Sequence, residues 1–183
     1  MESVIDKSSE QLMREVAEGD LDAFGQIVLR HQKLAWGIAY RFLGDQHEAE
    51  EIAQEAFLRI LDAAPRYKPT AAFTTYLSRI VTRLCLDHAR KKHPAATDAL
   101  PAVQDNSLSA TERLAIQDRE LAIRAALDRL PPAQRMAVVL RYFDGLDCRS
   151  VALAMDTTVK AAERLLARAR DTLEPLLANL FKE

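Results

Sequence analysis

The sequence has few of the residues that break helices and few of those that favour strands. Its 183 residues include only 5 Gly and 7 Pro, and aromatic residues make up 6% of the chain. Ala and Leu, which are strong helix formers, number 30 and 25. The composition therefore predicts a mostly helical protein. With 49% hydrophobic residues, the chain can bury a core, which excludes disorder throughout.

Two further shortages exclude other classes of protein. The two cysteines, Cys85 and Cys148, are too far apart in sequence to indicate a disulfide framework. The longest nearly apolar run, from Leu34 to Tyr40, is too short to cross a bilayer. The first residues have no apolar core and no cleavage site, so no secretory signal is expected. A cytoplasmic protein with reduced thiols and no stable membrane insertion is predicted.

The net charge of -2 conceals segments of opposite sign. Residues 45–62 contain six acids and one base, whereas residues 63–93 contain seven bases and one acid. Residues 131–170 contain seven bases and four acids. Because basic patches attract phosphate, the two basic segments are candidates for DNA binding. The nearly neutral total argues against a protein that coats DNA unaided.

Apolar residues at helical spacing predict two small helical domains. One helix covers residues 24–42 and ends at Gly44, a second runs from about 47 to 64, and the third covers 73–92. Residues 93–108 have no such period and indicate a flexible linker. Helices resume at 109–130, where Ser109 opens a capping-box pattern, and after the prolines at 131 and 132. The expected fold is all-α.

The segment from Cys148 to Ala167 has the spacing of a helix-turn-helix. Asp147 and Thr158 can cap its two helices, and the turn falls at Asp156 and Thr157. The inward positions are expected at Val151, Ala152, Met155, Ala162 and Leu165. The second helix would then present basic side chains and one Glu to a major groove. An ordinary helical hairpin with solvated bases is the alternative interpretation.

Two longer segments together resemble a known family. HEAEEIAQEAFLRIL, Pro65 and then FTTYLSRIVTRLCLDHARKK resemble region 2 of bacterial sigma factors of the extracytoplasmic-function (ECF) group. LDRLPPAQRMAVVLRYFDGLD, followed by VALAMDTTVKAAERLLARAR, resembles region 4 of the same family. The resemblance implies an alternative sigma factor that binds core RNA polymerase, recognises the minus-10 and minus-35 promoter elements and promotes transcription initiation.

The resemblance also implies a division of the chain and three sets of contact residues. The expected parts are an N-terminal segment (1–19), a region 2-like domain (20–93), a linker (94–110), a region 4-like domain (111–175) and a tail (176–183). Core polymerase would contact Glu50, Glu51, Gln54, Glu55 and Phe57. The minus-10 element would contact Tyr67, Lys68, Tyr76, Arg79, Arg83, Arg90 and Lys91. The minus-35 element would contact Lys160, Glu163, Arg164 and Arg168.

Several of these residues have a second interpretation. Phe57 and Tyr76 fit a helix core equally well, and the acidic helix face could simply be solvated. Tyr76 stands where the family usually has Trp, and Arg83 replaces the usual Asn, so the base preferred at that position is open. In region 4 the family's common S-Y-x-E-I-A corresponds to residues 147–152, DCRSVA. An anti-sigma protein is a further expected partner.

No enzyme, metal site or cofactor is expected. Cys85, His88 and His93 are close in sequence, but a fourth zinc ligand is missing. The sequence has no Ser-His-Asp elbow, no phosphate-binding Gly loop and no HExxH motif. Two other functions remain as alternatives: a stand-alone helix-turn-helix regulator, and a protein-interaction module that occupies polymerase or an anti-sigma protein without reading DNA.

Overall fold

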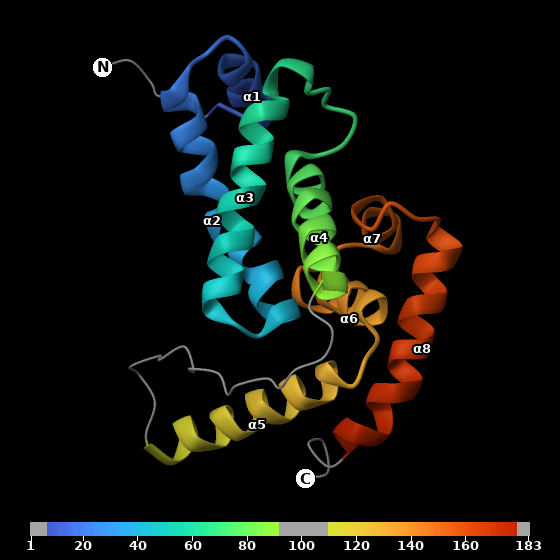
Figure 1. Cartoon of the computed structure of the whole chain (residues 1–183). Helices are drawn as coiled ribbons and strands as arrows, with labels where there is room; N and C mark the ends of the chain where they lie inside the picture. Colours follow the sequence, from blue (N-terminus) through green and yellow to red (C-terminus); the bar gives the residue numbers. More distant parts are fainter. Residues whose placement is uncertain (1–6, 92–109, 179–183) are drawn as a thin grey trace.

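A computed structural model describes residues 7–91 and 110–178, with side chains from residue 119 onward in the second range. Its helices lie in two groups, joined by residues outside these ranges (Figure 1). In chain order they are α1 (Ser9–Ala17), α2 (Leu21–Leu43), α3 (Gln46–Ala63), the short 3-10 helix η1 (Ala64–Arg66), α4 (Phe73–Lys91), α5 (Ala110–Asp128), α6 (Pro132–Val138), the π-helical turn η2 (Val139–Phe143), α7 (Cys148–Ala154) and α8 (Val159–Leu177). The described residues contain no strand, which confirms the predicted all-α class.

The first domain is built on α2, α3 and α4, which pack side by side (Figure 1). Each helix contributes an apolar face, and Ile38, Phe42, Ile60, Leu77 and Val81 are among its most deeply buried side chains. The helix boundaries agree with the local sequence signals. Asp20 caps the start of α2, Gly44 ends it in the left-handed conformation at φ +78°, and η1 with Pro65 follows α3.

An N-terminal helix that the sequence analysis did not predict completes this domain. Ser8 and Gln11 form a reciprocal capping box at the start of α1. Leu12, Met13 and Val16 point into the core and are at most 5% exposed. The residues expected to form a separate N-terminal segment therefore include a helix that is packed on α2.

The second domain contains α5 to α8 around a smaller core, in which Met136, Val139 and Leu140 are fully buried. Pro132 occupies the first turn of α6, as predicted. The predicted single helix over 132–143 instead changes to π-helical hydrogen bonding at Val139, and Gly145 follows at φ +68°. The predicted linker and the capping-box residue Ser109 lie outside the described residues.

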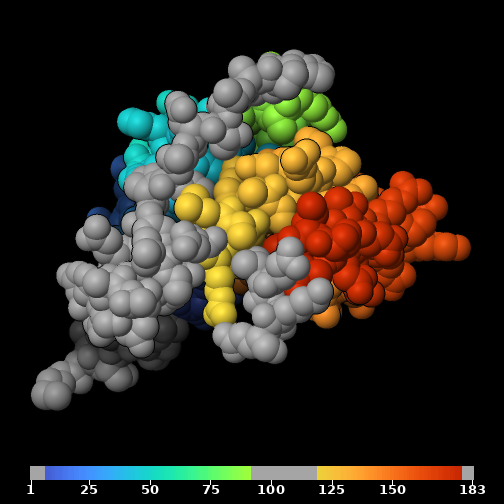
Figure 2. Space-filling model, turned by 90° about the horizontal axis from the view of Figure 1, so that it is seen from below, coloured from blue at the N-terminus to red at the C-terminus, as the bar shows by residue number. Residues whose placement is uncertain are grey.

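The two domains contact one another. The end of α5 and α6, yellow and orange in Figure 2, lie between the first domain and α8. On the other side, α7 packs against α4 (Figure 1). The basic helix of the first domain and the helix-turn-helix of the second are therefore direct neighbours.

Candidate nucleic-acid interface

The acidic surface predicted to bind a protein partner lies on α3. Glu50, Glu51 and Gln54 are exposed, whereas Glu55 is half-buried and forms an ion pair with Arg59 at 2.8 Å between Oε1 and Nε. Phe57 is only 6% exposed and belongs to the core. Of the two interpretations of Phe57, burial supports the structural one. The polar residues therefore carry the accessible part of this surface.

Three aromatic rings cluster where η1 leads into α4. The Tyr67 and Tyr76 ring centroids lie 5.1 Å apart, and Phe73 lies 6.4 Å from Tyr67 and 6.2 Å from Tyr76. Phe73 is buried, while both tyrosines are half-buried and retain accessible ring surface. Burial raises the pKa of both Tyr67 and Tyr76. Tyr76 therefore packs in the cluster and keeps part of its surface accessible, and its contact with a base stays a prediction.

The hydroxyl of Tyr67 is buried and finds no hydrogen-bond partner among the described residues. Buried polar groups usually have a hydrogen-bond partner, so an unsatisfied hydroxyl at the edge of the aromatic cluster is unusual.

The start of α4 is held by α1, a contact that the sequence analysis missed. The Phe73 backbone N–H donates to Glu10 Oε1 at 3.0 Å. Hydrogen bonds from backbone N–H groups, first that of Glu10 itself and then that of Phe73, lower the pKa of this carboxyl. The His31 ring lies 4.8 Å from the Phe73 ring, and His31 Nε2 is 2.7 Å from Ser9 Oγ. The Glu10 carboxylate of α1 therefore caps the start of α4, the helix that carries the aromatic and basic candidate residues.

Basic side chains continue along one face of α4. Arg79, Arg83 and Arg90 are exposed, and their spacing of four and then seven residues places them on the same side of the helix as Tyr76. Lys68 and Lys91 are exposed at the two ends of this segment. Arg79 Nη2 bonds to Asp156 Oδ1 at 2.9 Å. A row of this kind matches the negative charge of a nucleic-acid backbone.

The helix-turn-helix has the predicted geometry. Asp147 accepts a bond from the Ser150 backbone N–H, Thr158 accepts one from Ala161, and Asp156 adopts the left-handed conformation at φ +54°. The bond from Ser150 lowers the pKa of the Asp147 carboxyl. Both predicted caps and the predicted turn are confirmed.

The inward face of the motif follows the prediction and includes one further residue. Val151, Ala152 and Ala162 are at most 3% exposed, and Met155 and Leu165 are half-buried against the core. Leu166, which was not predicted, is also buried, at 6% exposed. The register of α8 places position 166 one turn below Ala162, directly over the core. Four candidate contact residues lie together on the exposed side of α8: Lys160, Glu163, Arg164 and Arg168.

The surroundings of Cys85 and His88 on α4 are those of structural side chains. Cys85 is fully buried, and burial strongly raises the pKa of its thiol. His88 Nε2 lies 3.3 Å from Glu48 Oε2 on α3, and His93 lies outside the described residues. Among the side chains that the structure describes, in residues 7–91 and 119–178, no group of three or more His, Cys, Asp or Glu is arranged to hold a metal ion.

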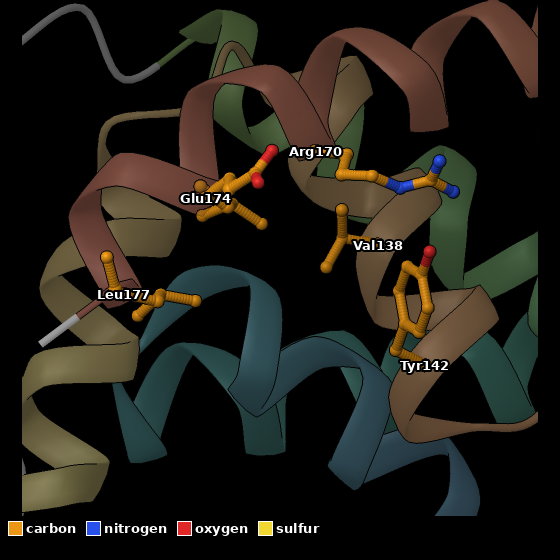
Figure 3. A pocket seen from close by; sticks show the side chains of 7 residues that line it. Val138, Tyr142, Arg170, Glu174 and Leu177 are labelled. Atoms are coloured by element: carbon orange, nitrogen blue, oxygen red, sulfur yellow. The ribbon is translucent and has the colours of Figure 1, made fainter. Parts of the chain in front are cut away.

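An open groove of about 420 Å³ runs between α6–η2 and the second half of α8 (Figure 3). Its walls are mainly apolar, and the candidate DNA-contacting residues lie outside it. At one end the Tyr142 hydroxyl faces the Arg170 guanidinium, and their hydrogen bond raises the pKa of Arg170. The groove is therefore separate from the basic surface of α8.

Comparison with known families supports both halves of this arrangement. Residues 27–94 match Sigma-70 region 2, and residues 120–173 match Sigma-70 region 4. The RNA polymerase sigma-H factor of Pseudomonas aeruginosa is 31% identical over 97% of this chain and 97% of its own length. The chain belongs to the sigma-70 family. The ECF RNA polymerase sigma factor SigW of Bacillus subtilis is 32% identical, over 92% of this chain and 96% of its own length. The protein is accordingly an alternative sigma factor that acts in transcription initiation, as the resemblance predicted.

Solved structures agree on the fold. CnrH, solved in complex with the cytosolic domain of CnrY, matches with a TM-score of 0.71 and 24% identity, over 94% of this chain and 99% of that one. The sigma factor RpoE of Bartonella quintana, solved with the anti-sigma factor NepR, matches with a TM-score of 0.67 and 18% identity, over 85% and 96%. Within the described part of this sigma factor, no helix is both long and apolar enough to span a membrane.

Proposed function

We propose that this sigma factor divides its three contacts among three helices. The exposed acidic face of α3 binds core RNA polymerase, the start and basic face of α4 bind the minus-10 element, and the exposed face of α8 binds the minus-35 element. Each assignment rests on side chains that are accessible on a separate helix. The predicted division into two domains, 20–93 and 111–175, stays part of this proposal, with α1 (Ser9–Ala17) added to the first.

The observation that carries the minus-10 assignment is the shared face of α4. Tyr76 offers a partly exposed ring, and Arg79 and Arg83 follow it on the same side of the helix. Unpaired bases stack on aromatic rings, and guanidinium groups hold the backbone beside them. Lys68, Arg90 and Lys91 extend the positive charge, and phosphate contacts of this kind position a protein without specifying sequence.

The minus-35 assignment rests on the register of α8. Because Ala162 and Leu166 face the core, Arg164 and Arg168 point outward on the helix that follows the turn. Arg reads guanine through two hydrogen bonds, and Glu163 can accept a bond from cytosine. The protein supplies recognition and leaves the chemistry to polymerase, so it needs no cofactor, and it acts in the cytoplasm beside polymerase and DNA.

An anti-sigma protein is part of the proposal as well. CnrH and RpoE, whose folds this chain shares, were each solved with a second protein, which for RpoE is named an anti-sigma factor. The exposed α3 and α8 surfaces offer a partner both acidic and basic side chains. A partner that covered these surfaces would block polymerase and DNA together.

The first experiment is size-exclusion chromatography of the protein with core bacterial RNA polymerase at moderate salt. We expect co-elution with polymerase and little binding of the protein alone to promoter fragments. Run-off transcription with Arg83→Ala and the exposed control Lys33→Ala on α2 then tests the face of α4, and only Arg83→Ala should lose promoter-dependent product.

Other outcomes would separate the alternatives. Tight sequence-specific DNA binding without polymerase association would instead favour a stand-alone regulator. Polymerase binding without promoter-dependent initiation would favour a pure interaction module.

A further inference from the structure

The start of α4 has no cap in its own local sequence. The Ala72 carbonyl accepts bonds from the N–H groups of Thr75 at 3.0 Å and Tyr76 at 3.2 Å, so Ala72 occupies the N-cap position. Its methyl side chain offers no acceptor to the free N–H groups of the first turn. Alanine is therefore a poor cap, and the first turn of α4 needs an acceptor from elsewhere.

Helix α1 supplies this acceptor. Glu10 Oε1 accepts a hydrogen bond from the Phe73 N–H at 3.0 Å, across 63 residues of chain. The carboxylate also brings negative charge to the positive end of the helix dipole. A hydrogen bond to a charged group is stronger than one between neutral groups. Glu10 thus provides, from another helix, the cap that Ala72 cannot provide.

A second contact joins α1 to the same residue. Ser9 Oγ lies 2.7 Å from His31 Nε2 on α2, and the His31 ring lies 4.8 Å from the Phe73 ring. Helix α1 also packs against η1, which precedes the turn into α4. It lies at the end of the domain where this turn is found (Figure 1). The N-terminal helix therefore contacts the segments on both sides of the turn.

Phe73 is the most buried ring of the aromatic cluster, so its position affects both tyrosines. Its ring centroid lies 6.4 Å from that of Tyr67 and 6.2 Å from that of Tyr76. Tyr76 also belongs to the first turn, through the bond of its N–H to the Ala72 carbonyl. The Glu10 carboxylate itself is negative and would repel phosphate. Any effect of Glu10 on DNA binding therefore passes through Phe73.

We propose that Glu10 is a positioning residue for the minus-10 element. It closes the first turn of α4 from α1, and it thereby holds Phe73 and Tyr76 in the arrangement that receives an unpaired base. The role in DNA binding rests on the proposed function, whereas the closing of the first turn does not. Helix α1 therefore contributes to promoter opening although Glu10 does not contact DNA.

Hydrogen exchange in the full-length free protein tests the cap. Glu10→Ala removes the acceptor, and Glu18→Ala is the matched control, because Glu18 is an exposed glutamate at the end of the same helix. We expect the Tyr76 amide to exchange about fivefold faster in the Glu10→Ala protein, the factor that corresponds to a lost helix cap. The control should exchange at the parent rate. Circular dichroism spectra identical to those of the parent protein exclude a loss of helices elsewhere.

A substitution that restores a cap within α4 makes the test specific. Serine is among the preferred N-cap residues, and its neutral hydroxyl adds no charge beside DNA. Ala72→Ser in the Glu10→Ala protein should therefore return the exchange of the Tyr76 amide towards the parent rate. Ala71→Ser, one position earlier, adds the same hydroxyl outside the N-cap position and should not. If Glu10 served only to hold α1 on the domain, neither serine would replace that contact.

Promoter opening tests the functional role. The probe is a DNA fragment selected from a random-sequence library by transcription with the parent holoenzyme, and permanganate reactivity of unpaired thymines measures its opening. Opening by the Glu10→Ala holoenzyme should fall by up to about fivefold, and Ala72→Ser should restore it. Core-polymerase affinity in a titration should be equal for the parent, Glu10→Ala and Glu18→Ala proteins, because no proposed polymerase contact lies on α1.

The outcomes separate the parts of the proposal. Equal exchange of the Tyr76 amide in the Glu10→Ala and Glu18→Ala proteins would overturn the cap. Faster exchange with unchanged promoter opening would overturn the positioning role, and so would a loss of opening that Ala72→Ser leaves in place. If the parent holoenzyme selects no promoter, the proposed function fails together with the minus-10 role of Glu10, while the exchange rates still decide the cap.

Discussion

Replacing Asp144 with asparagine should stabilise the protein at neutral pH and change its stability little near pH 4. The Asp144 side chain is only 6% exposed, and one of its two oxygens has no hydrogen-bond partner in the described structure. Burial raises the pKa of this carboxyl from 3.8 to about 6, although the nearby Arg41 opposes the rise. The folded protein therefore holds the proton more tightly than the unfolded chain does.

The sign and size of the effect follow from that difference in pKa. The contribution of Asp144 to the free energy of unfolding is complete below pH 4 and declines as the pH rises through 6. A shift of about two units corresponds to at most about 3 kcal/mol at pH 7. The amide that replaces the carboxyl would not ionise and keeps an oxygen for Arg41. The stability difference should thus grow from pH 4 to 6 and then level off.

Urea unfolding followed by Trp36 fluorescence, between pH 4 and 8, measures this difference. Asp62→Asn, which removes an exposed carboxylate from α3, controls for the loss of one negative charge. The free energy of unfolding is plotted against pH for both proteins. If the Asp144→Asn curve runs parallel to that of the parent protein from pH 4 to 8, the carboxylate is not desolvated as described, and the reasoning fails.

Three further substitutions test the proposed contacts. Glu51→Lys on α3 should weaken core-polymerase binding about fivefold at low salt and leave the melting temperature unchanged; equal affinity in a titration would remove the docking assignment. Arg168→Ala should cost about 1–3 kcal/mol of binding to minus-35 DNA, and an equal loss on every sequence would make it a phosphate contact. Thr158→Ala should cost about 1 kcal/mol of stability through the lost cap of α8. Thr157→Ala, at the exposed neighbouring position, is the matched control. Equal melting temperatures for the Thr158→Ala and Thr157→Ala proteins would contradict the capping role.

The features predicted from the sequence are those whose causes lie within a few residues. Gly44 ends α2, while Asp147 and Thr158 cap α7 and α8 through backbone groups three residues away. The turn at Asp156 belongs to the same group, because a small polar side chain tolerates the left-handed conformation. Such signals repeat in any chain, so they predict helix boundaries without knowledge of the fold.

The missed features join residues that are far apart in sequence. Glu10 caps a helix 63 residues later, and Arg124 reaches carbonyls more than 80 residues earlier. Nothing in the local sequence distinguishes these side chains from other charged residues on amphipathic helices. Helix α1 itself was predictable, because Ser8 and Gln11 have capping-box spacing before an apolar pair. Leu166 was missed beside the predicted Leu165 because two adjacent leucines fit the same helical stripe.

The bond from Phe73 to Glu10 has a practical consequence for anyone who shortens this protein. A version that begins at α2 would retain every residue proposed to touch DNA or polymerase. It would nevertheless lose the carboxylate at the start of α4, together with the apolar cover from Leu12 and Met13. Poor promoter opening by such a fragment would report a frayed helix start rather than a missing contact.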